Sequence, residues 1–140
     1  MEINLDFDGT CVTHEFPKVG KDIGAVPVLK ELVANGHNII LFTMRSDVTE
    51  LYSKRHEIVT ESGNYLTDAV NWFKENDIPL YGIQTNPTQH TWTTSPKSYA
   101  QIMIDDSALG CPLSYDAKGV FSTRPFVDWV RVRHLLVEVG

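Results

Sequence analysis

The chain has 140 residues, of which 42% are hydrophobic and 21% are charged, an ordinary balance for a globular protein. Its net charge of −6 argues against general nucleic-acid binding and against an anionic membrane surface, because both need a basic face. No stretch approaches the ~18 apolar residues of a membrane span, no signal-like run opens the chain, and the two cysteines form no Cys-x-x-Cys pair. These features predict one domain over residues 1–140, cytoplasmic and with reduced thiols.

The first ten residues carry the strongest chemical signal. Ile3 and Leu5 predict the end of a short buried strand, and Asp6 and Asp8 follow at positions that face one side of an extended chain. Two like charges this close are costly unless a hard cation such as Mg2+ stabilises them or one of them keeps a proton. This predicts Asp6 as a nucleophile beside the metal and Asp8 as general acid and base. The alternative is a surface turn with solvated acids, since Asp-Gly is a common turn dipeptide.

A loop and a helix come next. Residues 11–22 contain a proline and a glycine and lack helical periodicity, so we expect a loop or a small β-flap over the site. Residues 24–35 repeat apolar side chains at helical spacing and stop at Gly36, which predicts a first helix. Three flap residues are candidates to meet a substrate, although such residues are more often simply solvated: His14, Lys18 and Lys21.

Three further apolar runs predict strands of a parallel sheet, because a continuous apolar run suits a strand buried on both faces. They are residues 38–43, 80–83 and 101–106. The first ends in Thr43, and the last ends in Asp105 and Asp106. Adjacent carboxylates repel, and a sheet end does not need them. The late acidic pair is therefore hard to explain by folding alone.

The segments between these runs predict helices and one polar loop. Helical spacing of apolar side chains is present in residues 47–62, 65–76 and from Pro125 onward. The first of these begins with a possible capping box, Asp47 and Glu50. Residues 84–96 predict a loop beside strand ends, where recognition residues often lie. His90 and Trp92 are its candidates for substrate contact, although Trp92 could equally cover the loop against the body.

Four signatures fall in order at or near these strand ends. They are Asp6-Phe-Asp-Gly-Thr10, the strand that ends in Thr43, Lys97 before the last strand, and Asp105-Asp106 after it. In this order the chain resembles the haloacid-dehalogenase (HAD) superfamily over residues 3–106. The resemblance implies an α/β fold of three layers, with a Rossmann-like parallel sheet, helices on both faces and the small β-flap after the first strand.

The resemblance also implies a Mg2+-dependent phosphatase that hydrolyses a phosphate monoester through an aspartyl-phosphate on Asp6. The implied catalytic residues are Asp6, Asp8, Thr43 and Lys97. The implied phosphate-binding groups are the amides near Phe7 and Met44 and the side chains of Thr43, Arg45 and Lys97; Arg45 could instead form an ion pair at a helix end. The implied metal site draws on Asp6, Asp8, Asp105 and Asp106. Side chains of neighbouring strand residues diverge, so only one of the last pair can bind directly; the resemblance favours Asp106 and leaves Asp105 to hold Lys97.

Predicted elements fill the intervals between the signatures, so no cap domain fits. The site should be open, and the substrate is expected to be a phosphorylated small molecule or a phosphorylated macromolecule; a homo-oligomer is one way to close such a site. Two alternatives stay open: a non-catalytic phosphate- or metal-binding regulatory module on the same fold, and a nucleotide-specific phosphatase, which rests on Trp92 and the open site. A response-regulator receiver domain fits less well, because its acidic pair belongs to the first strand.

Overall fold

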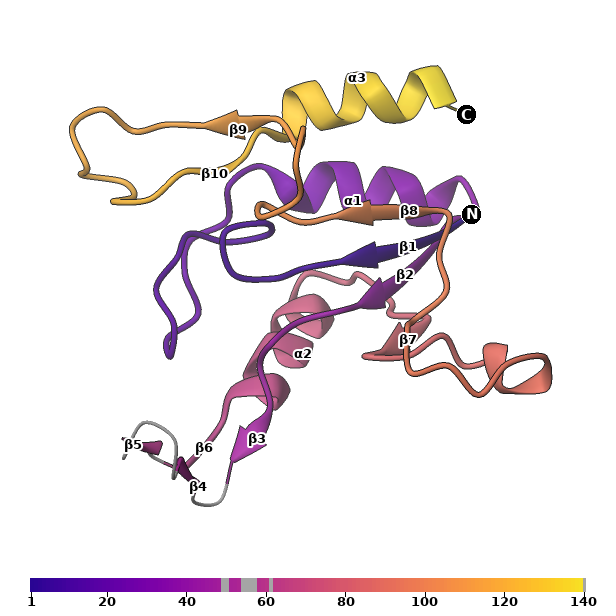
Figure 1. Cartoon of the computed structure of the whole chain (residues 1–140). Helices are drawn as coiled ribbons and strands as arrows, with labels where there is room; N and C mark the ends of the chain where they lie inside the picture. Colours follow the sequence, from indigo (N-terminus) through magenta and orange to yellow (C-terminus); the bar gives the residue numbers. More distant parts are fainter. Residues whose placement is uncertain (49–50, 54–57, 61, 140) are drawn as a thin grey trace.

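A four-stranded parallel sheet forms the centre of the molecule, in the order β7-β2-β1-β8 (Figure 1). The computed structural model describes residues 1–48, 51–53, 58–60 and 62–139. The sheet consists of β1 (Glu2–Leu5), β2 (Asn38–Leu41), β7 (Gly82–Ile83) and β8 (Ile102–Ile104). Leu5 pairs with Leu41 on one side and Ile104 on the other, and Leu41 pairs with Ile83. The four strands therefore end in one row, and the residues that follow them meet at one edge.

Helices cover both faces of this sheet. They are α1 (Ala25–Ala34), α2 (Tyr65–Glu75) and α3 (Trp129–Val139). In Figure 1, α1 and α3 lie together on one side of the sheet and α2 lies on the other. The described residues thus form a mixed α/β fold, consistent with the Rossmann-like arrangement expected from the sequence. None of the described helices has the length and apolar character needed to cross a membrane.

The first helix is built as its sequence predicts. The side chain of Asp22 accepts a hydrogen bond from the amide of Ala25 at 3.2 Å, which satisfies one of the free donors at the start of α1. At the other end Gly36 takes a φ of +85°, a conformation that glycine adopts without a Cβ clash. The amide of His37 then donates to the carbonyl of Leu32, which closes the helix.

The helix predicted for residues 47–62 is wrong. The described part of this segment forms two antiparallel pairs, β3 (Asp47–Val48) with β6 (Gly63–Asn64) and β4 (Leu51–Ser53) with β5 (Ile58–Thr60). Asp47 does not open a helix here, because its carboxylate accepts hydrogen bonds from the amide and hydroxyl of Thr67, at 2.9 and 2.6 Å. Glu50, the other half of the expected capping box, lies outside the described residues.

The C-terminal helix begins later than Pro125. Phe126–Val127 forms β10, which pairs with β9 (Leu113–Ser114), and α3 starts only at Trp129. Hydrogen bonds to the turn after β1 keep Phe126 and Val127 in an extended conformation. The amide of Val127 donates to the carbonyl of Gly9 at 2.9 Å, and the indole of Trp129 donates to the carbonyl of Thr10 at 2.7 Å. These bonds fasten the end of the chain to the turn after β1.

The two predicted loops are present in altered form. Residues 11–22 fold back on themselves, with the amide of Thr13 bonded to the carbonyl of Lys21. The described residues of this segment form isolated β-bridges and no paired strand, so the flap is a loop. The loop of residues 84–96 contains one 3-10 turn, η1 (Gln89–Thr91).

Candidate functional site

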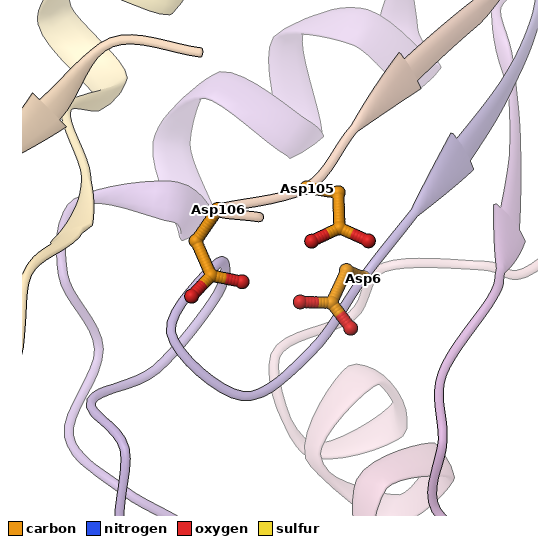
Figure 2. Close-up of side chains that lie close together, drawn as sticks. All are labelled: Asp6, Asp105 and Asp106. Atoms are coloured by element: carbon orange, nitrogen blue, oxygen red, sulfur yellow. The ribbon is translucent and has the colours of Figure 1, made fainter. Parts of the chain in front are cut away.

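Three carboxylates meet where the strands end. Asp6 follows β1 directly, and Asp105 and Asp106 follow β8, its neighbour in the sheet. One oxygen from each of the three lies within 4.8 Å of the other two (Figure 2). All three residues are partly buried. A donor set made only of carboxylate oxygens, converging from two strands, suits a hard divalent cation.

Asp105 and Asp106 do not diverge as strand neighbours would, and in this the sequence-based expectation is wrong. The strand ends at Ile104, and the chain then turns. The carboxylate of Asp105 accepts hydrogen bonds from the amide and hydroxyl of Ser107, at 2.9 and 2.8 Å, and its carbonyl accepts the amide of Ala108. Outside the strand, side-chain alternation no longer applies, and both carboxylates face Asp6 (Figure 2).

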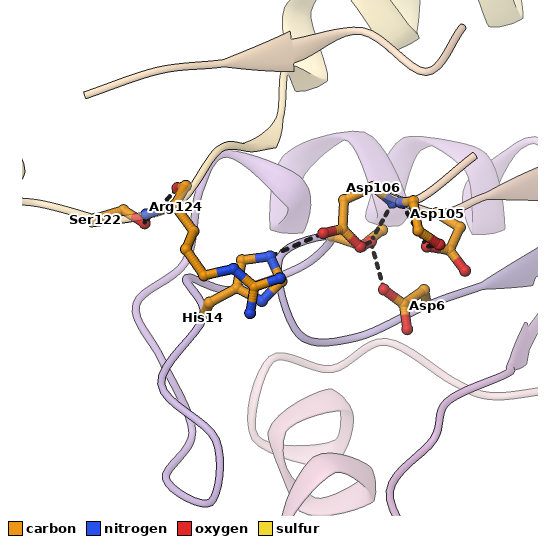
Figure 3. Close-up of polar contacts among 8 residues, drawn as sticks. Asp6, His14, Asp105, Asp106, Ser122 and Arg124 are labelled. Atoms are coloured by element: carbon orange, nitrogen blue, oxygen red, sulfur yellow. Dashed lines mark hydrogen bonds and ion pairs between the residues drawn. The ribbon is translucent and has the colours of Figure 1, made fainter. Parts of the chain in front are cut away.

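Two residues near the first turn hold this cluster together. The hydroxyl of Thr10 donates to Asp6 at 2.8 Å and accepts the amide of Asp106 at 3.1 Å. His14, in the loop 11–22, places its Nε2 atom 2.8 Å from a carboxylate oxygen of Asp106 (Figure 3). Figure 3 also shows the side chain of Arg124 extending toward His14. From the sequence alone, Thr10 is only part of a signature and His14 is only a candidate for substrate contact.

The environment of Asp6 disfavours its negative charge. The pKa of Asp6 is raised from its ordinary 3.8 to about 8, mainly by burial, with smaller contributions from the charge of Asp105 and the hydrogen bond to Asp106. The hydrogen bond from Thr10 acts in the opposite direction. Without a cation, Asp6 therefore retains its proton to a higher pH than an ordinary carboxyl group does.

Asp8 does not join these three acids. Its carboxylate accepts two hydrogen bonds from Arg45, from Nε and from Nη2, each 2.8 Å long. Arg45 is only 3% exposed. The ion-pair alternative for Arg45 is therefore the one observed, although its partner is Asp8 and not a residue at a helix end.

The turn after β2 is fixed by a residue that sequence analysis missed. The side-chain amide of Gln84 donates to the carbonyl of Thr43 at 2.7 Å, and its oxygen accepts the amide of Thr43 at 2.9 Å. The hydroxyl oxygen of Thr43 accepts the amide of Arg45, and no acceptor for its hydrogen is assigned among the described residues. Thr43 can thus still donate to a ligand. The side chain of Met44 is 97% exposed.

The remaining candidate site residues differ in how far they are buried. Phe7 is fully buried and packs against Trp72 and Phe73 of α2. In the loop 84–96 Trp92 is 62% exposed, and its ring contacts that of Tyr99.

Lys97 is exposed, and within the described ranges no hydrogen bond or ion pair joins its ammonium to an acid. Its backbone carbonyl accepts the side chain of Gln89 at 2.9 Å. The next residue, Ser98, is bonded through both its hydroxyl and its carbonyl to Asn4, two positions before Asp6. The backbone at Lys97 therefore runs beside β1, and the part given to its ammonium stays a prediction.

No protein-family model matches the chain, and no curated protein matches it. A solved structure does resemble it, that of a conserved protein coded by a locus of Bacteroides thetaiotaomicron. The two share 27% sequence identity and a TM-score of 0.70, and the likeness covers 100% of this chain and 92% of the other. A natural protein of similar length thus has the same α/β fold from end to end, and the likeness carries no activity to this chain.

Proposed function

We propose that the chain is a Mg2+-dependent phosphatase of the HAD type that hydrolyses a phosphate monoester through a covalent intermediate on Asp6. The observation that carries the proposal is the meeting of Asp6 with Asp105 and Asp106 at one edge of a parallel sheet. A surface turn with solvated acids does not account for it, because three clustered carboxylates destabilise the fold unless something binds them.

The donor set fits the metal that the HAD resemblance implies. Asp6, Asp105 and Asp106 supply oxygens alone, the ligands that Mg2+ prefers, and the backbone carbonyl of Asp8 is the further ligand that the resemblance adds. The pKa of Asp6 is raised mainly by burial and further by the charge of Asp105, so a cation at this place would stabilise its carboxylate. When bound, the ion would supply electrostatic stabilisation for the negative charge that gathers on the phosphoryl oxygens.

The chain's own residues then have defined tasks. A carboxylate oxygen of Asp6 forms a bond to phosphorus as the ester P–O bond breaks, and Asp8 gives a proton to the departing alkoxide. A water molecule next attacks phosphorus, Asp8 takes the proton from it, and the carboxylate of Asp6 is restored. The hydroxyl of Thr43 and the ammonium of Lys97 would bind the phosphoryl oxygens. Arg45 occupies one lone pair on each oxygen of Asp8, and the second lone pair of each oxygen stays available for proton transfer.

The test is turnover of phosphate esters by the purified protein with Mg2+ and with EDTA. A panel of an aryl phosphate, sugar phosphates, nucleotides and 3′-phosphorylated oligonucleotides covers both expected substrate classes. Asp6→Asn should abolish release of phosphate, because an amide cannot serve as the nucleophile. Asp77→Asn is a matched control, since Asp77 is exposed at the end of α2 and has a φ of 56° that asparagine tolerates. Full activity of Asp6→Asn would refute the proposal.

A second candidate function is favoured by one observation, the hold of Arg45 on both oxygens of Asp8. A module that binds phosphate or a metal without turnover has no need of a free Asp8. Binding of Mg2+ without phosphate release from any member of the panel would support this second function.

A further inference from the structure

Arg45 is buried beside the acidic edge, and every donor of its guanidinium is used. Nε and Nη2 bond the two oxygens of Asp8 at 2.8 Å, and Nη2 also donates to the carbonyl of Lys18 at 2.8 Å. Nη1 donates to the carbonyls of Pro17 and Tyr65, at 3.4 and 3.2 Å. A buried arginine with five hydrogen bonds is fixed in place, because moving it would leave donors of its own buried guanidinium unpaired.

Two aromatic rings also contact the same guanidinium. Its central carbon lies 5.1 Å from the ring centre of Phe7 and 5.1 Å from that of Phe16, which is within the range of a cation–π contact. The ring of Phe16 in turn contacts that of Tyr65, with centres 5.2 Å apart. The planar, delocalised charge of arginine suits this setting, and the compact ammonium of lysine does not.

These contacts join four segments of the chain. Arg45 itself follows β2, Asp8 belongs to the turn after β1, Pro17 and Lys18 belong to the loop 11–22, and Tyr65 opens α2. The loop 11–22 is the one that carries His14 to Asp106. One side chain thus sets both the direction of Asp8 and the seating of the loop over the acidic cluster.

We propose that Arg45 is a positioning residue of the site: it holds the Asp8 carboxylate in place for proton transfer and fastens the loop 11–22 over the acids. This inference rests on the proposed phosphatase function, since it acts through Asp8. In this inference Arg45 acts by holding Asp8, and it does not bind a distal anion of the substrate.

The experiment compares Arg45→Gln and Arg45→Lys with the unchanged protein on two esters, phenyl phosphate and p-nitrophenyl phosphate. Protonation of the leaving group matters most when that group is basic, so kcat for phenyl phosphate should fall at least about tenfold more than kcat for p-nitrophenyl phosphate. KM should change little for either ester. Arg45→Lys should not restore kcat, because one ammonium cannot bond both oxygens in this way.

The matched control is Arg133→Gln. Arg133 bonds both oxygens of Glu31 at 2.8 Å, in the same two-pronged geometry, but on the surface and remote from the acids. It should leave both esters unaffected. Limited trypsin digestion gives a readout that needs no turnover: cleavage after Lys18 and Lys21 should become faster in Arg45→Gln and stay unchanged in Arg133→Gln.

The possible results distinguish failure of the positioning role of Arg45 from failure of the proposed phosphatase function. No turnover by the unchanged protein would overturn both. Turnover that falls equally for the two esters, or full recovery in Arg45→Lys, would overturn the positioning role of Arg45 and leave the phosphatase proposal standing.

Discussion

His14 and Asp106 lie 92 residues apart in the sequence, and Nε2 of the first is 2.8 Å from a carboxylate oxygen of the second. The contact joins the loop 11–22 to the turn after β8, at the margin of the cluster of three acids (Figure 3). It gives Asp106 a second fixed partner besides Thr10, whose hydroxyl accepts the amide of Asp106. Outer partners of this kind orient a ligating carboxylate and affect how tightly it binds a metal.

We therefore expect His14→Ala to weaken Mg2+ binding by about tenfold, because Asp106 loses the partner that orients it. Isothermal titration of the purified protein measures this directly. His90→Ala is the control, since His90 is exposed and, among the described residues, its ring bonds only the carbonyl of Pro87 in its own loop. Tighter binding in His14→Ala would contradict the expectation and show that His14 competes with the ion for Asp106.

The approach of His14 depends on Gly9. A Cβ atom on Gly9 would lie 1.9 Å from Nε2 of His14 and 2.6 Å from a carboxylate oxygen of Asp106. The φ of Gly9 is +79°, which also strains any residue with a side chain. Gly36 has a similar φ of +85° and nothing within 4 Å of an added Cβ. A substitution at Gly36 therefore tests backbone strain alone, and a substitution at Gly9 tests the same strain together with a clash in the site.

Gly9→Ala and Gly36→Ala should both lower the free energy of unfolding, each by about 1–2 kcal/mol of backbone strain. Only Gly9→Ala should also reduce Mg2+ affinity and phosphate release, because it displaces His14 and Asp106. Urea unfolding and metal titration on the two variants measure the two effects. Equal metal binding in both variants would mean that the site adapts to the added methyl group.

The sequence predicts the sheet edge well because its signals are local. Apolar runs that end in Asp6, Thr43 and Asp105 mark strand ends, and parallel strands place those ends together. The partners of these residues are set by tertiary contacts. Nothing in the neighbourhood of Gln84 indicates that its amide bonds both backbone groups of Thr43.

The misread segments have the same cause. Asp47 is a residue type that often caps a helix. Its carboxylate instead accepts hydrogen bonds from Thr67, 20 residues further along the chain. Pro125 has the identity of a helix start, but Val127 bonds Gly9 instead. The local sequence at Asp47 and at Pro125 is compatible with a helix and also with the structure observed. Long-range hydrogen bonds determine which of the two forms.

The raised pKa of Asp6 predicts how stability depends on pH. Its pKa in the folded protein is about 8, above the ordinary 3.8, so the metal-free folded state binds this proton more tightly than the unfolded state does. The stability that Asp6 contributes is full below about pH 4 and is lost as the pH rises through about 8. Asp6→Asn has no such proton, and its stability should therefore fall less over this range.

Mg2+ should reverse the loss, because it binds the folded state and takes the place of the proton. Below pH 8 its apparent affinity should rise about tenfold per pH unit, as one proton leaves for each ion bound. Thermal unfolding from pH 5 to 9, with EDTA and with Mg2+, measures both effects in the unchanged protein and in Asp6→Asn. Identical pH profiles for the two proteins in EDTA would show that Asp6 is not the group that titrates, and that the cluster tolerates its charges without a cation.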